Sequence, residues 1–112
     1  MDRQDDLAKV RRAYARKLMS VATVSDPRIE AAYAAVPREK FLGPGPWRLA
    51  TEDGEYYQTP SADPEHLYAD TVVSILPERG LNNGRPSLHL KLMAHSSPKP
   101  GEHVVHVGAG VG

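Results

Sequence analysis

The sequence contains no cysteine, so neither a disulfide framework nor a zinc site with thiolate ligands is available to the protein. It also lacks an excess of charge of either sign, because 14 Lys and Arg residues balance 14 Asp and Glu residues. Such a balance does not favour the strong nonspecific attraction to nucleic acid or to an anionic membrane that a basic protein shows. Small molecules or proteins are therefore the expected partners, and nothing in the sequence indicates an oligomeric state.

Long apolar runs are missing as well. No stretch approaches the roughly 20 apolar residues of a membrane-spanning helix. The first six residues are polar and acidic, whereas a secretory signal needs a basic start and an apolar run. The histidines have no acidic neighbours at a recognisable metal-ligand spacing. These absences predict a cytoplasmic protein that binds neither a membrane nor a metal ion.

The chain has 112 residues, of which 40% are hydrophobic and 25% charged, and this fits one soluble domain or a piece of one. Between Arg3 and about Ala22, apolar residues recur three or four apart, which predicts a long amphipathic helix. The apolar face consists of Leu7, Val10, Tyr14, Leu18 and Val21. Aspartates upstream offset the basic residues of the other face, so we interpret that face as solvated rather than as a phosphate-binding patch. Its basic residues are Arg11, Arg12, Arg16 and Lys17.

Two Asp-Pro pairs predict helix starts, since the aspartate accepts protons from orphan amides and proline has no amide proton to lose. After Asp26, a short helix should run over residues 27–35 and end before Pro37, because the residue before a proline is pushed out of the helical region. After Asp63, a single helical turn should cover residues 64–67.

Further local patterns fill the middle of the chain. The β-branched run 71–76 predicts a strand, and Asn-Asn-Gly at 82–84 predicts a turn. Glycine and proline make residues 43–47 a loop, whose Trp47 we expect to pack onto the helices; covering a substrate groove is the alternative. Pro86 can start another helix. That helix carries three residues on one face, Leu88, Leu92 and His95.

The end of the chain has the pattern of a ligand-binding turn. The short apolar run 104–107 is typical of a buried parallel strand, and it leads into glycines at 108, 110 and 112. Glycines after such a strand let the backbone approach a nucleotide-like ligand closely. The dinucleotide fingerprint needs its third glycine one position later, so this spacing favours S-adenosylmethionine over a nicotinamide cofactor. A frayed glycine-rich terminus is the other interpretation.

Three segments carry a specific resemblance. Val-Pro-Arg-Glu-Lys-Phe at 36–41, Tyr68-Ala69-Asp70, and the tail from Pro100 to the final glycines are similar to segments of the protein-L-isoaspartate O-methyltransferase family. They occur in the family's order and extend over most of the chain. The resemblance implies an S-adenosyl-L-methionine-dependent methyltransferase that methylates isoaspartate in a protein or peptide substrate.

The resemblance also implies an α/β fold. A helical, substrate-side region at residues 1–80 would lead into the first strand of a Rossmann-like methyltransferase sheet. Residues 81–112 would be the start of the cofactor domain, truncated in its glycine loop. A fragment of this kind should be inactive alone. Arg38 and Glu39 are expected to form a structural ion pair at a helix end. The cofactor-binding residues that the resemblance implies are His106, Gly108, Ala109, Gly110 and Gly112.

Two departures from the family bear on the substrate. Counting back without gaps from Gly108, Gly84 stands where the family has the serine usually assigned an active-site role, and Asn82 stands where it has threonine. His106 stands in place of the family's glutamate. The catalytic residues are therefore unknown, with Asn82, Asn83 and Arg85 as nearby candidates. Of these, Arg85 is the best placed to meet an anionic substrate.

Several functions stay open from the sequence. A carboxylate acceptor has a pKa of about 4 and needs no general base, whereas a hydroxyl or amine acceptor would need one of the histidines. A methyltransferase of the same fold with a different acceptor is one alternative. A non-catalytic helical interaction module and a nicotinamide oxidoreductase are the others. The available imidazoles are His66, His89, His95, His103 and His106.

Overall fold

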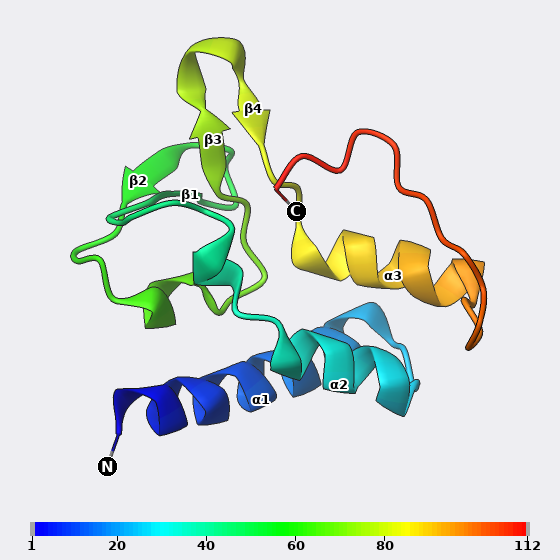
Figure 1. Ribbon diagram of the computed structural model, residues 1–112. Helices are drawn as coiled ribbons and strands as arrows, with labels where there is room; N and C mark the ends of the chain where they lie inside the picture. Colours follow the sequence, from blue (N-terminus) through cyan, green and yellow to red (C-terminus); the bar gives the residue numbers. More distant parts are fainter. Residues whose placement is uncertain (1, 112) are drawn as a thin grey trace.

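The computed structural model describes residues 2–111 and places a bundle of helices beside two small antiparallel sheets (Figure 1). The first helix, α1, is Arg3–Ala22, as its periodicity predicts. The Asp2 carboxylate caps its start by accepting from the Gln4 amide at 3.3 Å. Thr23, in the left-handed conformation at φ 55°, ends it.

Helix α2, Pro27–Ala35, also has the predicted bounds. The Asp26 carboxylate accepts from the Arg28 amide at 3.0 Å, and Val36 is already extended. Helix α3, Pro86–Ser96, follows Arg85 and packs beside α1 (Figure 1). The three helices enclose one apolar cluster, made of Tyr14, Leu18, Met19, Ala22, Ile29 and Leu90.

The sheets form a second half of the molecule. Strand β1, Arg48–Ala50, pairs antiparallel with β2, Tyr56–Gln58, and β3, Ser74–Leu76, pairs with β4, Leu81–Asn82. An isolated bridge between Leu49 and Val73 joins the two hairpins. Single 3-10 turns lie between the larger elements, at η1 Arg38–Lys40, η2 Pro64–Leu67 and η3 Pro77–Arg79. The second core cluster is Trp47, Leu49, Leu67 and Val73.

Several sequence predictions meet a clear outcome in these halves. Trp47 is 6% exposed and its indole N–H donates to the Gly43 carbonyl at 3.1 Å. It does not cover a groove, but the expected packing onto the helices is also wrong, because Trp47 lies in the cluster of the sheets. The strand predicted at 71–76 is shorter, because only Ser74–Leu76 pairs with a neighbour as a ladder. The predicted apolar face of α3 is turned outward, with Leu88 and Leu92 exposed, and Leu90 is the buried residue instead. Val21 of α1 is likewise exposed.

The predicted buried strand at 104–107 is wrong for this chain. Residues 102–106 have no regular structure, and Val104, Val105 and Val107 are 70%, 73% and 90% exposed. A strand needs a neighbour to pair its amide and carbonyl groups, and no described residue pairs with this segment. The residues described thus form a small α/β domain with two antiparallel sheets, without a Rossmann-like parallel sheet.

Among the helices described, none combines the length and the apolarity that crossing a membrane requires.

Candidate functional site

Tyr68 joins two of the segments that carry the family resemblance. Its hydroxyl donates to the Glu39 carboxylate and accepts from the Arg38 amide at 3.2 Å. The Arg38 side chain also bonds to the segment around Tyr68, because its Nη1 donates to the carbonyls of Leu67 and Ala69, the latter at 3.2 Å. Turn η1 and the end of η2 are therefore fastened together from both sides.

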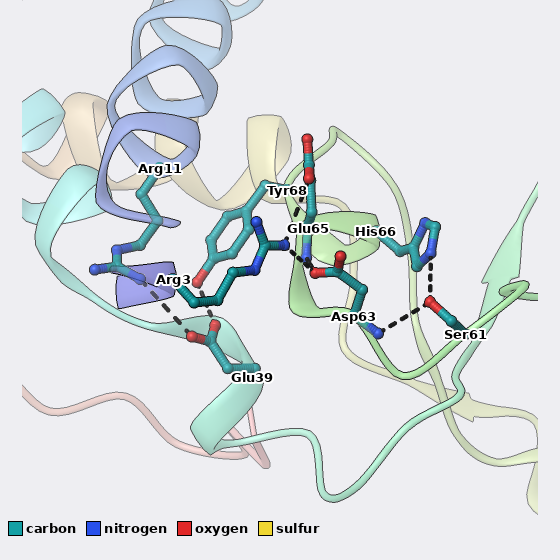
Figure 2. A network of polar contacts seen from close by, with 8 residues as sticks. All are labelled: Arg3, Arg11, Glu39, Ser61, Asp63, Glu65, His66 and Tyr68. Atoms are coloured by element: carbon teal, nitrogen blue, oxygen red, sulfur yellow. Dashed lines mark hydrogen bonds and ion pairs between the residues drawn. The ribbon is translucent and has the colours of Figure 1, made fainter. Parts of the chain in front are cut away.

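Arg11 of α1 enters the same network, and Figure 2 shows its side chain and Tyr68 both directed at Glu39. The Arg11 Nη1 lies 3.7 Å from Glu39 Oε1, and its Nε donates to the Ala34 carbonyl at 3.2 Å. Only 13% of the Arg11 side chain is exposed, so the prediction of a solvated residue is wrong here, although Arg12, Arg16 and Lys17 are exposed. Glu39 thus forms an ion pair with Arg11 and accepts a hydrogen bond from Tyr68, while Arg38 donates to backbone carbonyls, in place of the expected ion pair between Arg38 and Glu39.

Two tyrosine rings and an arginine guanidinium pack together next to this network. The Tyr14 and Tyr68 rings meet edge to face at 5.3 Å, and the Arg38 guanidinium lies 5.6 Å from the Tyr14 ring centre. Burial raises the pKa of Tyr14 to about 12. Burial and the hydrogen bond to Glu39 raise the pKa of Tyr68 to about 12. Both phenols are therefore neutral at physiological pH.

A cavity of about 240 Å³ opens beside Tyr14 and Arg38, between α2, the segment after η1, and the start of α3. Arg38 brings a positive charge to its wall, and the described lining residues include no Asp or Glu. The volume is below the roughly 300–1,000 Å³ of drug-sized sites. The side chains of Tyr14, Tyr33, Arg38, His89 and Met93 line the cavity together with Gly84.

The candidates around Gly84, where the family has a serine, divide into two groups. Asn83 and Gly84 line the cavity, but Asn82 and Arg85 do not. The Asn83 side chain accepts from the Val73 amide at 2.8 Å, so its oxygen holds the β3 segment in place. Asn82 Oδ1 accepts from the Gly84 amide at 2.9 Å and stabilises the predicted turn. Arg85 is exposed, which leaves it outside the site.

His89 is a site residue whose role the sequence did not predict. A Cβ placed on Gly84 would lie 2.5 Å from His89 Nε2, so the imidazole occupies the space that a side chain at position 84 would need. Gly84 has φ +76°, a conformation that also favours glycine. The ring is half-buried and makes no hydrogen bond to another described residue. The only local signal for this contact is Pro86, which predicts a helix start and so places His89 in the first helical turn after Gly84.

The residues predicted to hold the cofactor do not form a site in this chain. His106, Gly108, Ala109 and Gly110 are exposed, and nothing lies within 4 Å of where a Cβ would stand on either glycine. Gly108 and Gly110 do have positive φ, at 76° and 60°. The described part of the tail is thus exposed, and Gly112 lies outside the described residues.

A separate polar cluster lies on the surface, at η2 (Figure 2). Arg3 pairs with Asp63 and, at 3.5 Å, with Glu65. Ser61 bonds the His66 ring at 3.1 Å. Asp63 also caps η2 by accepting from the Glu65 amide, so the cluster ties α1 to this turn. Within residues 2–111 no group of three or more potential ligands is arranged to hold a metal ion.

Comparison with protein-family models, curated proteins and solved structures gave no match to this chain. The likeness to the isoaspartyl methyltransferase family rests on the sequence segments themselves.

Proposed function

We propose that this chain forms the acceptor-binding side of an S-adenosyl-L-methionine-dependent methyltransferase resembling protein-L-isoaspartate O-methyltransferase. The observation that carries the proposal is that the resembling segments meet: the second is bonded to the first, and the first lines one cavity together with Val111 of the tail. Residues 36–41 and 68–70 are joined through Tyr68 and Arg38, which are 30 positions apart. Chance likeness gives no reason for separate motifs to contact one another.

The segment at 80–86 comes to the same place through Asp70. Its carboxylate Oδ1 accepts from the Ser87 amide at 2.9 Å, at the start of α3. This bond holds the N-terminus of α3, and with it Gly84, beside the cavity. Val111, near the end of the glycine-rich tail, lines the same cavity. This position supports the proposal that the cavity takes an acceptor beside a ligand held by the tail.

Cofactor binding is assigned by this proposal to a longer protein. The family's fold has further strands, which would pair residues 104–107 and bring His106, Gly108, Ala109, Gly110 and Gly112 against the ligand. The tail of this chain lacks such partners among the described residues, so we propose that the chain alone is inactive. A reducing cytoplasm is the compartment we propose, in keeping with a sequence free of cysteine.

The test uses the product of the complete reading frame that encodes this chain. Methyl transfer from labelled S-adenosylmethionine is measured to an isoaspartyl peptide, to its normal aspartyl counterpart, and to small carboxylic acids. We expect transfer to at least one of these acceptors, and a loss of transfer in Gly110→Val. Gly54→Val is the matched control, since Gly54 also has positive φ in open space but lies in the turn between β1 and β2. A product that transfers to no acceptor would overturn the proposal.

One observation favours a second candidate, a helical interaction module without catalysis. Leu88, Leu92 and Met93 leave an apolar face of α3 exposed, and a partner helix or sheet would cover such a face. This candidate predicts that the complete product does not bind S-adenosylmethionine.

A further inference from the structure

The cavity has the electrostatics of a site for a small anion with an apolar body. Arg38 brings its positive charge to the wall, whereas neither of the two nearby carboxylates lines the cavity: Glu39 is engaged by Arg11 and Tyr68, and Asp70 accepts from the Ser87 amide. The Arg38 bonds to carbonyls use Nη1, and no described residue accepts a hydrogen bond from its Nε or Nη2. Guanidinium donors with no partner are suited to a carboxylate.

The remaining wall is apolar or aromatic. Tyr14, Tyr33, Phe41 and Met93 present rings and a thioether to the cavity. Burial raises the pKa of Tyr33 as it does that of Tyr14, so neither phenol brings a negative charge near neutral pH. A volume of about 240 Å³ suits one ring or branched chain with a short linker.

His89 supplies the second polar contact. Its imidazole lies over Gly84, at the position where the resembled family has a hydroxyl-bearing side chain, and its ring has no hydrogen-bond partner among the described residues. A Cβ at 84 would come within 2.5 Å of Nε2, so a side chain there would displace the imidazole from this position. Gly84 and His89 are thus sterically coupled.

We propose that Gly84 and His89 form a specificity-determining pair, in which the imidazole replaces a side chain at 84 and, with Arg38, binds a small aromatic or branched carboxylic acid. This proposal rests on the proposed function for the identification of the cavity as the acceptor site. In this proposal the methyl acceptor is a free small molecule and not a damaged protein. The missing serine at position 84 is then a change of specificity rather than a loss of a site.

The probe is hydrocinnamate, titrated into the 112-residue chain and followed by amide shifts in NMR spectra. Its uncharged isostere hydrocinnamamide is the matched ligand control. We expect hydrocinnamate to shift the amides of Gly84, His89 and Met93 with a millimolar Kd, and the amide ligand to bind at least about tenfold more weakly. Equal binding of the two ligands would overturn the assignment of a carboxylate.

Variants test the coupling of the pair. His89→Ala should weaken hydrocinnamate about tenfold, and so should Gly84→Ser, which displaces the ring. Gly84→Ser introduced into His89→Ala should weaken binding clearly less than it does in the native chain, because the group it displaces is already gone, and any cost of backbone strain at 84 is the same in both backgrounds. Leu88→Ala is the control, since Leu88 is exposed on α3 and does not line the cavity. Full additivity, or unchanged binding in His89→Ala, would overturn the pair.

The same titration with an isoaspartyl peptide separates the two acceptor classes. Shifts at these amides with the peptide but not with hydrocinnamate would contradict the small-molecule acceptor while leaving the proposed methyltransferase intact. If hydrocinnamate binds but the complete product transfers no methyl group, the carboxylate site would stand and the proposed methyltransferase would be contradicted.

Discussion

Tyr68 illustrates how one side chain holds the site together. Its hydroxyl contacts a charged carboxylate and a backbone amide, and its ring packs on Tyr14. The Arg11 guanidinium lies 5.9 Å from the centre of the same ring. Removing the hydroxyl therefore removes bonds to two parts of η1 without changing the apolar packing.

We expect Tyr68→Phe to lower the free energy of unfolding by about 1–2 kcal/mol, because the Glu39 carboxylate and the Arg38 amide lose their partner. The measurement is urea unfolding followed by circular dichroism. Tyr57→Phe is the control, since Tyr57 is 48% exposed and should change stability by less than about 0.5 kcal/mol. Equal effects of the two substitutions would show that the Tyr68 bonds do not stabilise the fold.

Buried phenols also predict how stability depends on pH. The pKa of Tyr14 and of Tyr68 rises from 10.0 to about 12 on folding, so above pH 10 the unfolded chain loses protons that the folded chain retains. Their contribution to stability is complete below pH 10 and is lost as the pH rises toward 12. Urea unfolding at increasing pH should show this decline, and Tyr14→Phe should make it shallower. A slope unchanged in Tyr14→Phe would contradict the raised pKa.

The sequence predicted which helix each site residue belongs to better than it predicted which partner the side chain contacts. Arg11 occupies the helix face that the sequence marks as solvated, yet α2 and η1 fold over it and leave Glu39 as its partner. His89 lies over Gly84 on a helix whose start is held by Asp70. Both outcomes depend on contacts between distant segments, which periodicity does not report.

At the scale of elements, α3 separates the core from the surface within one helix. Leu90 is fully buried in the cluster with α1, whereas Leu92 is 58% exposed. The helix is thus fixed to the bundle through one row of side chains, and this row sets the position of the cavity wall.

Leu90→Ala should therefore cost about 2–5 kcal/mol, since it leaves a cavity between α1 and α3. Leu92→Ala, two positions along the same helix, should change stability by less than about 0.5 kcal/mol. Thermal unfolding of both variants is the measurement. Similar losses in the two would mean that α3 packs through a different face.

The tail makes a prediction for amide exchange. The amides of Val104, Val105 and Val107 have no partner among the described residues and should exchange at nearly the rate of an unfolded chain, while those of Leu18 and Leu90 are protected. In the product of the complete reading frame, the three valine amides should become protected by neighbouring strands. Hydrogen exchange read by NMR decides this, and equally fast exchange in both proteins would contradict the proposed strand.

Helices were predicted from sequence more accurately than strands for a physical reason. The starts of α1 and α2 depend on Asp2, Asp26 and a proline, all within a few residues of the bonds they make. A strand depends on partners elsewhere, so the apolar run at 104–107 predicts a strand correctly only if those partners are present. The same reason explains why only part of 71–76 pairs.

At the scale of the whole molecule, two cores meet at the site. The helical cluster carries Tyr14 and Leu90, and the sheet cluster carries Leu67 and Val73, next to Tyr68 and Asn83. The cavity is lined by the helices and by the segments that connect them to the sheets, at Leu42, Asn83 and Gly84, with Val111 of the tail against it. Such a junction suits an acceptor site that a cofactor domain completes.

The most direct test of the proposed methyltransferase is equilibrium dialysis of S-adenosylmethionine against the product of the complete reading frame, beside the 112-residue chain. We predict saturable binding to the complete product, loss of that binding in Gly110→Val but not in Gly54→Val, and no binding to the chain alone. A complete product that does not bind S-adenosylmethionine would contradict the proposed function.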